Sequence, residues 1–244
     1  MTDFPAGDFK SIMSGAESAV IISPHLDDAA LSLGSAMLAG SLGSRPHIVV
    51  VFSISNYTFE TPGTGDVEAV TRIRKGEEKT ACRLMKASLQ FLDYGEPLVR
   101  GACGKYEEVF NKDFEPASDP LYHRIAGEIK GIKEQRKPDL LIFPLALGDH
   151  LDHILLNSIG LDLLAEGDSR IMFFEDLPYA GILEPEEIEL IGKGRGLKPY
   201  AIPGLDLNSK LLLLKTYQSQ LDEFSFLAVK RYHTLRGAEH LWGK

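Results

Sequence analysis

The sequence predicts an α/β sandwich in which helices cover both faces of a mostly parallel sheet. Two observations lead to this fold class. Short apolar segments of strand length alternate along the chain with longer stretches of helical periodicity. The apolar segments are also continuous, as in IVVVFSI at residues 48–54, which is typical of parallel strands buried on both faces. We therefore expect right-handed crossovers and a functional crevice beyond the carboxyl ends of the strands.

The individual elements follow from local patterns. Strands are predicted over residues 19–23, 48–54, 89–92, 139–144 and 170–174, and helices over residues 28–39, 66–87, 119–135 and 208–224. Asp66 is a candidate N-cap for its helix, and Pro138 marks the end of the third helix. Residues 183–207 are rich in Gly, Pro and charge, and neither they nor the tail 228–244 has a clear pattern.

Length and composition limit the number of domains and exclude some functions. A chain of 244 residues without a repeat or a long linker is expected to form a single domain over residues 1–244. The 44% hydrophobic content excludes a disordered chain, and the net charge of −9 argues against a nucleic-acid partner. Every apolar segment is far shorter than the ~20 residues of a membrane span. Residues 1–17 show no secretory signal and two cysteines cannot build a disulfide framework, so we expect a cytoplasmic location.

Two short segments rich in ionisable side chains follow predicted strands. SPHLDD occupies residues 23–28, and GDHLDH occupies residues 148–153. Because the carboxyl ends of parallel strands meet at one edge of a sheet, we expect both segments to contribute to one site. Imidazoles and carboxylates without a thiolate are typical ligands of Zn²⁺ or another first-row divalent ion. Three ligands are enough for a catalytic ion, so an Asp remains as a general base and a His to stabilise an oxyanion or protonate a leaving group.

Each of these residues also has an ordinary structural explanation. An Asp directly before a helix usually caps it, which applies to Asp27 or Asp28 taken alone. His25 alone is more simply a hydrogen-bonded buried histidine. His150 and His153 are three residues apart and can be partly exposed neighbours on a helix. A shared metal site is favoured over these separate explanations because both segments stand at the carboxyl ends of predicted parallel strands.

SPHLDDAALSLG at residues 23–34 and GDHLDH at residues 148–153 together resemble the motifs of PIG-L/LmbE-type metal-dependent N-deacetylases. FFEDLPYA at 173–180, YQSQ at 217–220 and GAEHLW at 237–242 are similar to one bacterial branch of that family. The resemblance implies a Rossmann-like three-layer fold. It also implies a zinc-dependent hydrolase, with Fe²⁺ or another divalent metal as alternatives, that removes acetyl from an N-acetylglucosamine-type amino sugar or glycoconjugate.

The resemblance further implies roles for individual residues. Asp27 would be the general base that takes a proton from water and later delivers it to the departing amine. His150, as an imidazolium, would stabilise the oxyanion, and Asp152 would orient a histidine or balance its charge. The residues implied as metal ligands are His25, Asp28 and His153.

Substrate contacts are less well defined by the sequence. The candidates are Arg74, Asp176 and Tyr179. For Arg74, an ion pair with Glu77 on a solvated helix is the preferred explanation. Asp176 follows a predicted strand and can equally satisfy backbone amides there.

Departures from the family pattern keep other functions open. Ala29 replaces the glutamate of the commonest D-D-E form, and Asn157 stands where many members have a further histidine. A hydratase or lyase would use the same metal chemistry, and a catalytically silent metal- or sugar-binding protein is a further alternative. Nucleotide binding is disfavoured because G-x-G-x-x-G does not follow the first predicted strand. Self-association into a homo-oligomer is plausible for a compact enzyme.

Overall fold

The computed structural model describes residues 18–168 and 170–244. The prediction that residues 1–17 contain no secretory signal lies outside the described residues. The strands are β1 (Ala19–Ser23), β2 (His47–Val50), β3 (Ser88–Phe91), β4 (Leu140–Pro144), β5 (Ile171–Phe174), β6 (Lys198–Ile202) and β7 (Glu239–Gly243). The α-helices are α2 (Asp28–Leu38), α3 (Val67–Leu84), α4 (Tyr122–Arg136), α5 (Leu151–Ala165), α6 (Pro185–Gly194), α7 (Leu207–Leu214) and α8 (Glu223–Arg236). Three short 3₁₀ turns lie at Tyr106–Val109, Pro116–Ser118 and Tyr179–Gly181.

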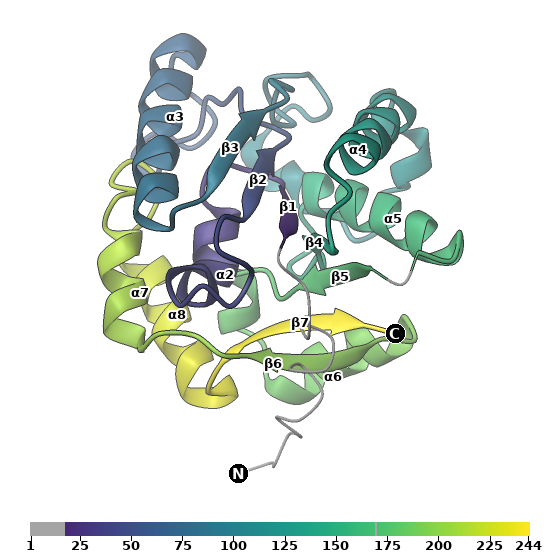
Figure 1. Ribbon diagram of the computed structural model, residues 1–244. Helices are drawn as coiled ribbons and strands as arrows, with labels where there is room; N and C mark the ends of the chain where they lie inside the picture. The colour runs from purple at the N-terminus through teal and green to yellow at the C-terminus, as the bar shows by residue number, and fades with distance from the viewer. Residues whose placement is uncertain (1–17, 169) are drawn as a thin grey trace.

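A mostly parallel sheet forms the centre of the protein, as the sequence predicts. The strands of the described residues are arranged in the order β3-β2-β1-β4-β5-β7-β6. All neighbouring pairs from β3 to β5 are parallel, whereas β7 is antiparallel to both β5 and β6. Helices α2, α3 and α7 lie on one side of the sheet, and α4 and α5 lie on the other (Figure 1). The predicted three-layer α/β architecture is therefore confirmed.

The strand order reverses at β1, which fixes the position of the functional crevice. β1 lies between β2 and β4, and Ala19 and Ile21 pair with Leu140 and Ile142 of β4. The chain leaves β1 towards β2 and β3, and it continues from β4 in the opposite direction towards β5. At such a switch point the connections after the two central strands diverge and leave a crevice at their carboxyl ends.

The β1 and β4 strands and the helix that follows β1 lie close to their predicted positions, but two other predicted elements are shorter. The strand predicted over 48–54 ends at Val50, although Val51 N and Phe52 N still donate to the carbonyls of Ser23 and Pro24 in the SPHLDD turn. The helix predicted over 208–224 is wrong in its second half. It ends at Leu214, and α8 begins anew after its cap, Asp222, whose side chain accepts from Ser225 N.

The region without a clear sequence pattern completes the sheet. Residues 183–207 contain α6 and the edge strand β6, and the tail contains the end of α8 and strand β7. Trp242 of β7 is fully buried, and its Nε1–H donates to Glu175 Oε1 over 2.8 Å. Both Cys82 and Cys103 are free thiols. None of the helices in the part of the chain that the structure describes is long and apolar enough to cross a membrane.

Candidate functional site

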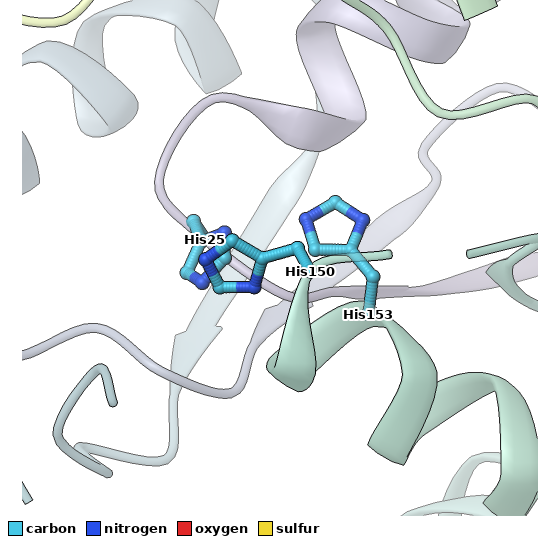
Figure 2. A group of neighbouring side chains, drawn as sticks. All are labelled: His25, His150 and His153. Carbon is cyan, nitrogen blue, oxygen red and sulfur yellow. The ribbon is translucent and has the colours of Figure 1, made fainter. Parts of the chain in front are cut away.

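The two motif segments meet at the carboxyl ends of β1 and β4. Figure 2 shows that the imidazoles of His25, from the turn before α2, and of His150 and His153, from the start of α5, lie together. The ring centroids of His25 and His150 are 4.7 Å apart, and His153 lies 5.2 Å from each of them. One ligand atom from each ring lies within 4.8 Å of the others. Residues 125 positions apart in the sequence thus form one buried cluster.

Local backbone geometry brings the second motif segment into this cluster. Gly148 has a φ of +85°, and a Cβ added there would lie 2.5 Å from Cγ of Tyr179. Glycine is therefore required both for the turn and for the close approach of the tyrosine ring. His150 then occupies the N-cap position of α5, where its Nδ1 accepts a hydrogen bond from the backbone N–H of Asp152 over 3.2 Å.

Three potential ligand atoms converge on one point of the cluster. Asp28 Oδ2 lies 3.2 Å from His25 Nδ1 and 3.3 Å from His153 Nε2. The same oxygen accepts the backbone N–H of His25 over 2.7 Å, which fixes its position. His153 Nε2 is buried and has no hydrogen-bond partner among the described residues. Two imidazole nitrogens and a carboxylate oxygen are a donor set that suits a divalent cation, so these residues fit a metal ion.

Two further carboxylates orient the imidazoles of His25 and His153. His25 Nε2–H donates to Asp152 Oδ2 over 3.0 Å, and His153 Nδ1–H donates to Asp176 Oδ1 over 2.7 Å. These bonds leave His25 Nδ1 and His153 Nε2 facing Asp28, as is typical of metal-binding histidines. Burial alone would lower the pKa of His153, but Asp28 and Asp176 raise it to about 9. In the same way, Asp152 and Asp28 overcome burial and raise the pKa of His25 well above its usual value. The surroundings therefore favour positive charge at this point.

Asp27 stands at the N-cap position of α2 but is oriented towards the cavity. Its side chain makes no capping hydrogen bond to the described residues of the helix, so the structural explanation by capping does not apply. Burial and the neighbouring Asp28 raise the pKa of Asp27 to about 7, although Arg74 and His25 oppose this shift. A carboxyl group with such a pKa can both accept and return a proton near neutrality.

The surroundings of His150 bear on the imidazolium role that the family resemblance implies. Burial and the neighbouring His25 hold the pKa of His150 well below its usual value. Its Nδ1 already accepts the backbone N–H of Asp152, so the proton of the neutral ring is on Nε2. This environment favours a neutral N–H donor at His150, and the role of His150 stays a prediction.

A cavity of about 320 Å³ opens beside the histidine cluster. Tyr57 and Tyr106 stack with ring centroids 5.3 Å apart, and Tyr106 contacts Phe110, whose ring lies 5.6 Å from that of His150. These aromatic rings form one wall that leads to the cluster. Residues 220–222, 224 and 225, just before and at the start of α8, also line the cavity.

Arg74 is part of this cavity, which corrects the preferred sequence interpretation. The Arg74 side chain is only 3% exposed. Its Nη1 lies 2.6 Å from Glu96 Oε1, and its Nε–H donates to Gln220 Oε1 over 2.6 Å. Glu77 does not pair with it but accepts from the backbone N–H and hydroxyl of Ser219. The predicted ion pair of Arg74 with Glu77 on a solvated helix is therefore wrong. The missed signal is the spacing from Val70 to Arg74, which places the arginine on the buried face of α3.

The other two candidate substrate contacts occupy different places. Tyr179 lines the cavity, with its ring centroid 5.7 Å from that of His153. Asp176 is completely buried behind His153, where it also accepts the backbone N–H of Leu147 over 3.0 Å. Its position fits the orientation of His153 rather than contact with a substrate.

The two departures from the family motifs lie away from the cavity wall. Ala29 is buried, and its backbone N–H donates to Ser23 Oγ over 3.2 Å. Asn157 Nδ2 donates to the carbonyl of Pro144 over 2.8 Å and so supports the end of β4. Both residues serve the backbone around the site.

Sequence reasoning missed the residues contributed by the segment after β3. Glu96 forms an ion pair with Arg74 in the cavity wall, and Arg100 Nη1 lies 2.7 Å from Asp152 Oδ1. The rule that sites form beyond strand ends applies to β3 as well as to β1 and β4. The segment DYGEPLVRG at residues 93–101 lacks a histidine or paired acids, so its sequence alone gives no sign of a site.

Comparisons with known proteins agree with this fold. The 2'-N-acetylparomamine deacetylase of Streptomyces fradiae is 27% identical over 229 residues, which are 91% of this chain and 80% of that protein. The zinc-inhibited form of teicoplanin deacetylase Orf2 has a TM-score of 0.70 at 19% identity and covers 92% of this chain and 97% of its own. The N,N'-diacetylchitobiose deacetylase of Pyrococcus horikoshii has a TM-score of 0.62 at 17% identity, over 95% and 80% of the two chains.

The same fold also occurs with another activity. GalB, the 4-carboxy-2-hydroxymuconate hydratase of Pseudomonas putida KT2440, has a TM-score of 0.55 at 15% identity, over 93% of this chain and 95% of its own. The assignment to a family comes from the sequence instead. The PIG-L model, described as GlcNAc-PI de-N-acetylase, matches residues 20–164, which include both motif segments and more than half of the chain. The chain therefore belongs to the PIG-L family.

Proposed function

We propose that this chain is a metal-dependent hydrolase that removes an N-acetyl group from an N-acetylglucosamine-type amino sugar or glycoconjugate. The convergence of His25 Nδ1, Asp28 Oδ2 and His153 Nε2 beside a cavity that also contains Asp27 carries this proposal. Membership of the PIG-L family and the similarity to a 2'-N-acetylparomamine deacetylase support the same reaction. We further propose that residues 1–244 act as one deacetylase domain, since segments from 25 to 225 line the cavity.

Zn²⁺ is the metal that we propose, with Fe²⁺ or another divalent ion as the alternative. His25, Asp28 and His153 would hold it, because imidazole and carboxylate ligands suit these ions. A divalent ion bound there supplies Lewis-acid polarisation of the amide carbonyl and makes a water molecule more acidic. Asp152 and Asp176 keep the two ligand imidazoles in orientation.

The side chains of the cavity have distinct tasks in amide hydrolysis. Asp27 accepts the proton of the attacking water and returns it to the amine as the C–N bond breaks, which releases acetate. His150 Nε2–H donates to the oxygen that gains negative charge in the tetrahedral transition state. Arg74 and Tyr179 line the space where the sugar ring lies.

An acetate-release assay tests this function. Metal-depleted protein is incubated with a panel of N-acetylated amino sugars and their glycosides, before and after addition of Zn²⁺ or Fe²⁺. We expect acetate release only after metal addition. Hydration of an unsaturated acid without acetate release would favour a hydratase instead, and sugar binding without turnover would favour a silent binding protein. Either outcome would reject the deacetylase.

The free thiols of Cys82 and Cys103 support a cytoplasmic location as part of this proposal, because thiols persist in reducing compartments. Self-association into a homo-oligomer stays a prediction. Measurement of the molar mass in solution by light scattering tests it.

A further inference from the structure

Arg100 lies outside both motif segments, yet its guanidinium contacts the carboxylate behind His25. Its Nη1 is 2.7 Å from Asp152 Oδ1, and its Nη2 is 3.3 Å from Asp119 Oδ2. The guanidinium carbon also lies 4.8 Å from the centre of the Phe52 ring. Only 10% of the Arg100 side chain is exposed. The arginine is therefore a buried element of the site rather than a surface charge.

The carboxylate of Asp152 connects Arg100 to His25. Oδ1 faces the guanidinium, while Oδ2 accepts the Nε2–H of His25 over 3.0 Å. Because Asp152 is completely buried, water cannot replace either partner. Rotation of the carboxylate would break at least one of the two contacts. The orientation of the His25 ring is thus coupled to the position of the arginine.

The corresponding carboxylate behind His153 has a different support. Asp176 Oδ1 accepts from His153, and its Oδ2 accepts the backbone N–H of Leu147 over 3.0 Å. The main chain therefore fixes Asp176, whereas a side chain from a distant loop fixes Asp152. Only the second arrangement can be removed by substitution of the supporting residue.

Arg100 is itself held from two directions. Its Nη1–H donates to the carbonyl of Gly95 over 3.2 Å, and its backbone N–H donates to the carbonyl of Glu96 over 3.0 Å. Asp119, the acid at its outer side, is fixed by the backbone N–H of Leu121 over 2.8 Å. An arginine suits this place because its planar fork can serve two carboxylates at once, which the single ammonium of a lysine cannot do in the same geometry.

We propose that Arg100 is a positioning residue that holds Asp152, and through it His25, so that His25 Nδ1 faces the proposed metal ion. This inference rests on the proposed function, because it concerns the same metal site. Loss of carboxylate partners behind metal-binding histidines typically weakens metal binding about 10- to 100-fold. Removal of Arg100 should act on the His25 side of the site and leave the His153 side unchanged.

The test compares Arg100→Met, which keeps an unbranched apolar side chain but removes the guanidinium that lies over Phe52, with Arg100→Lys, which keeps the charge but loses the fork. Arg72→Met is the matched control, since Arg72 is exposed and pairs only at 3.9 Å with the exposed Glu68. Zn²⁺ affinity is measured by competition with a chelator. We expect Arg100→Met to weaken it about 10-fold or more. Arg100→Lys should lose less Zn²⁺ affinity than Arg100→Met, and the affinity of Arg72→Met should match that of the wild type.

A second measurement separates positioning from a general loss of structure. In the zinc-loaded protein labelled with ¹⁵N-histidine, NMR reports the solvent exchange of the two ring protons held by carboxylates. In Arg100→Met, the Nε2–H of His25 should exchange faster, while the Nδ1–H of His153, held by Asp176, should be unchanged. If Arg100→Met does not fold, Asp119→Asn removes the outer partner of the arginine and serves for the same two measurements.

The outcomes distinguish this inference from the proposed function. A wild-type protein that neither binds Zn²⁺ nor releases acetate rejects both. A wild-type protein that does both, together with an Arg100→Met variant of unchanged affinity and unchanged His25 exchange, rejects only the role of Arg100. Equal acceleration of exchange at His25 and His153 shows general loosening and also rejects it.

Discussion

The Asp27 carboxylate lies 4.0 Å from the Arg74 guanidinium, although Asp27 occupies a position from which aspartates normally cap a helix. Asp66, at the equivalent position of α3, does cap its helix, with Oδ1 accepting Ala69 N over 2.8 Å. The two aspartates have the same place in a helix but different partners. This difference separates a group available for chemistry from a group that stabilises the fold.

Substitution of these two aspartates should therefore affect different properties. Asp27→Asn should lower acetate release by roughly 10²–10⁴-fold, because the proton acceptor is lost, and should keep the metal content and the free energy of unfolding close to the wild-type values. Asp66→Ala should keep the activity but lose about 1 kcal/mol of the free energy of unfolding. Acetate release, metal analysis and urea unfolding measure the three quantities. Full activity of Asp27→Asn would exclude Asp27 as the base.

The three histidines should also differ in their effects on metal binding. His25→Ala and His153→Ala should lose both metal and activity, because their free nitrogens face Asp28 Oδ2. His150→Ala should keep the metal and lower the rate about 10²–10³-fold, as expected for loss of an oxyanion donor. Metal analysis after dialysis, together with acetate release, distinguishes the residues. Loss of the metal from His150→Ala would instead indicate a site made of three histidines.

The centre of the fold and the ligand cluster were readable from the sequence because both depend on local patterns. Continuous apolar runs such as AVIIS at 19–23 are buried over their whole length, and the polar residues directly after them stand at the sheet edge. A strand-end rule then brings His25 and His153 together without knowledge of the packing. The roles assigned to Asp27 and His150 remain predictions until their variants are measured.

The parts that the sequence did not predict depend on distant contacts. Strand β6 is a partly exposed edge strand with a proline at residue 199, and among the described strands it pairs with β7 alone. Arg74 looks like a surface residue in the local sequence RIRKGEE, but its partners Glu96 and Gln220 come from other parts of the chain. Long-range ion pairs of this kind leave no periodic signal.

The contact between Gly148 and Tyr179 predicts an effect of a single methyl group. An alanine at residue 148 would place Cβ 2.5 Å from the tyrosine ring at a φ of +85°, so Gly148→Ala should displace Tyr179 and the nearby His150. We expect kcat/KM to fall about 10-fold, in line with misplaced catalytic groups. Gly131→Ala in α4 is the control, since its Cβ meets no described atom within 4 Å and should stabilise the protein by ~0.5–1 kcal/mol. Equal activity of both variants would contradict the steric argument.

Glu78 gives the protein a pH-dependent stability that is independent of the proposed reaction. It is 1% exposed on α3, where its Oε2 accepts the hydroxyl of Tyr217 over 2.7 Å. Burial raises the pKa of Glu78 from 4.5 to about 7, although the hydrogen bonds from Tyr217 and Cys82 oppose the shift. Between these two values the folded state keeps a proton that the unfolded state has lost. The free energy of unfolding should therefore decrease as the pH rises from 4.5 to 7.

The magnitude follows from the size of this shift. Ionisation of the buried Glu78 should cost about 3 kcal/mol of stability at pH 8 relative to pH 4.5. Glu78→Gln keeps an acceptor for Tyr217 but cannot ionise, so it should remove this loss and be more stable than the wild type at pH 8, with little difference at pH 5. Urea unfolding of the metal-free proteins at both pH values measures the effect. Parallel pH profiles for the two proteins would show that Glu78 is ionised in the fold at neutral pH, stabilised by partners other than Tyr217.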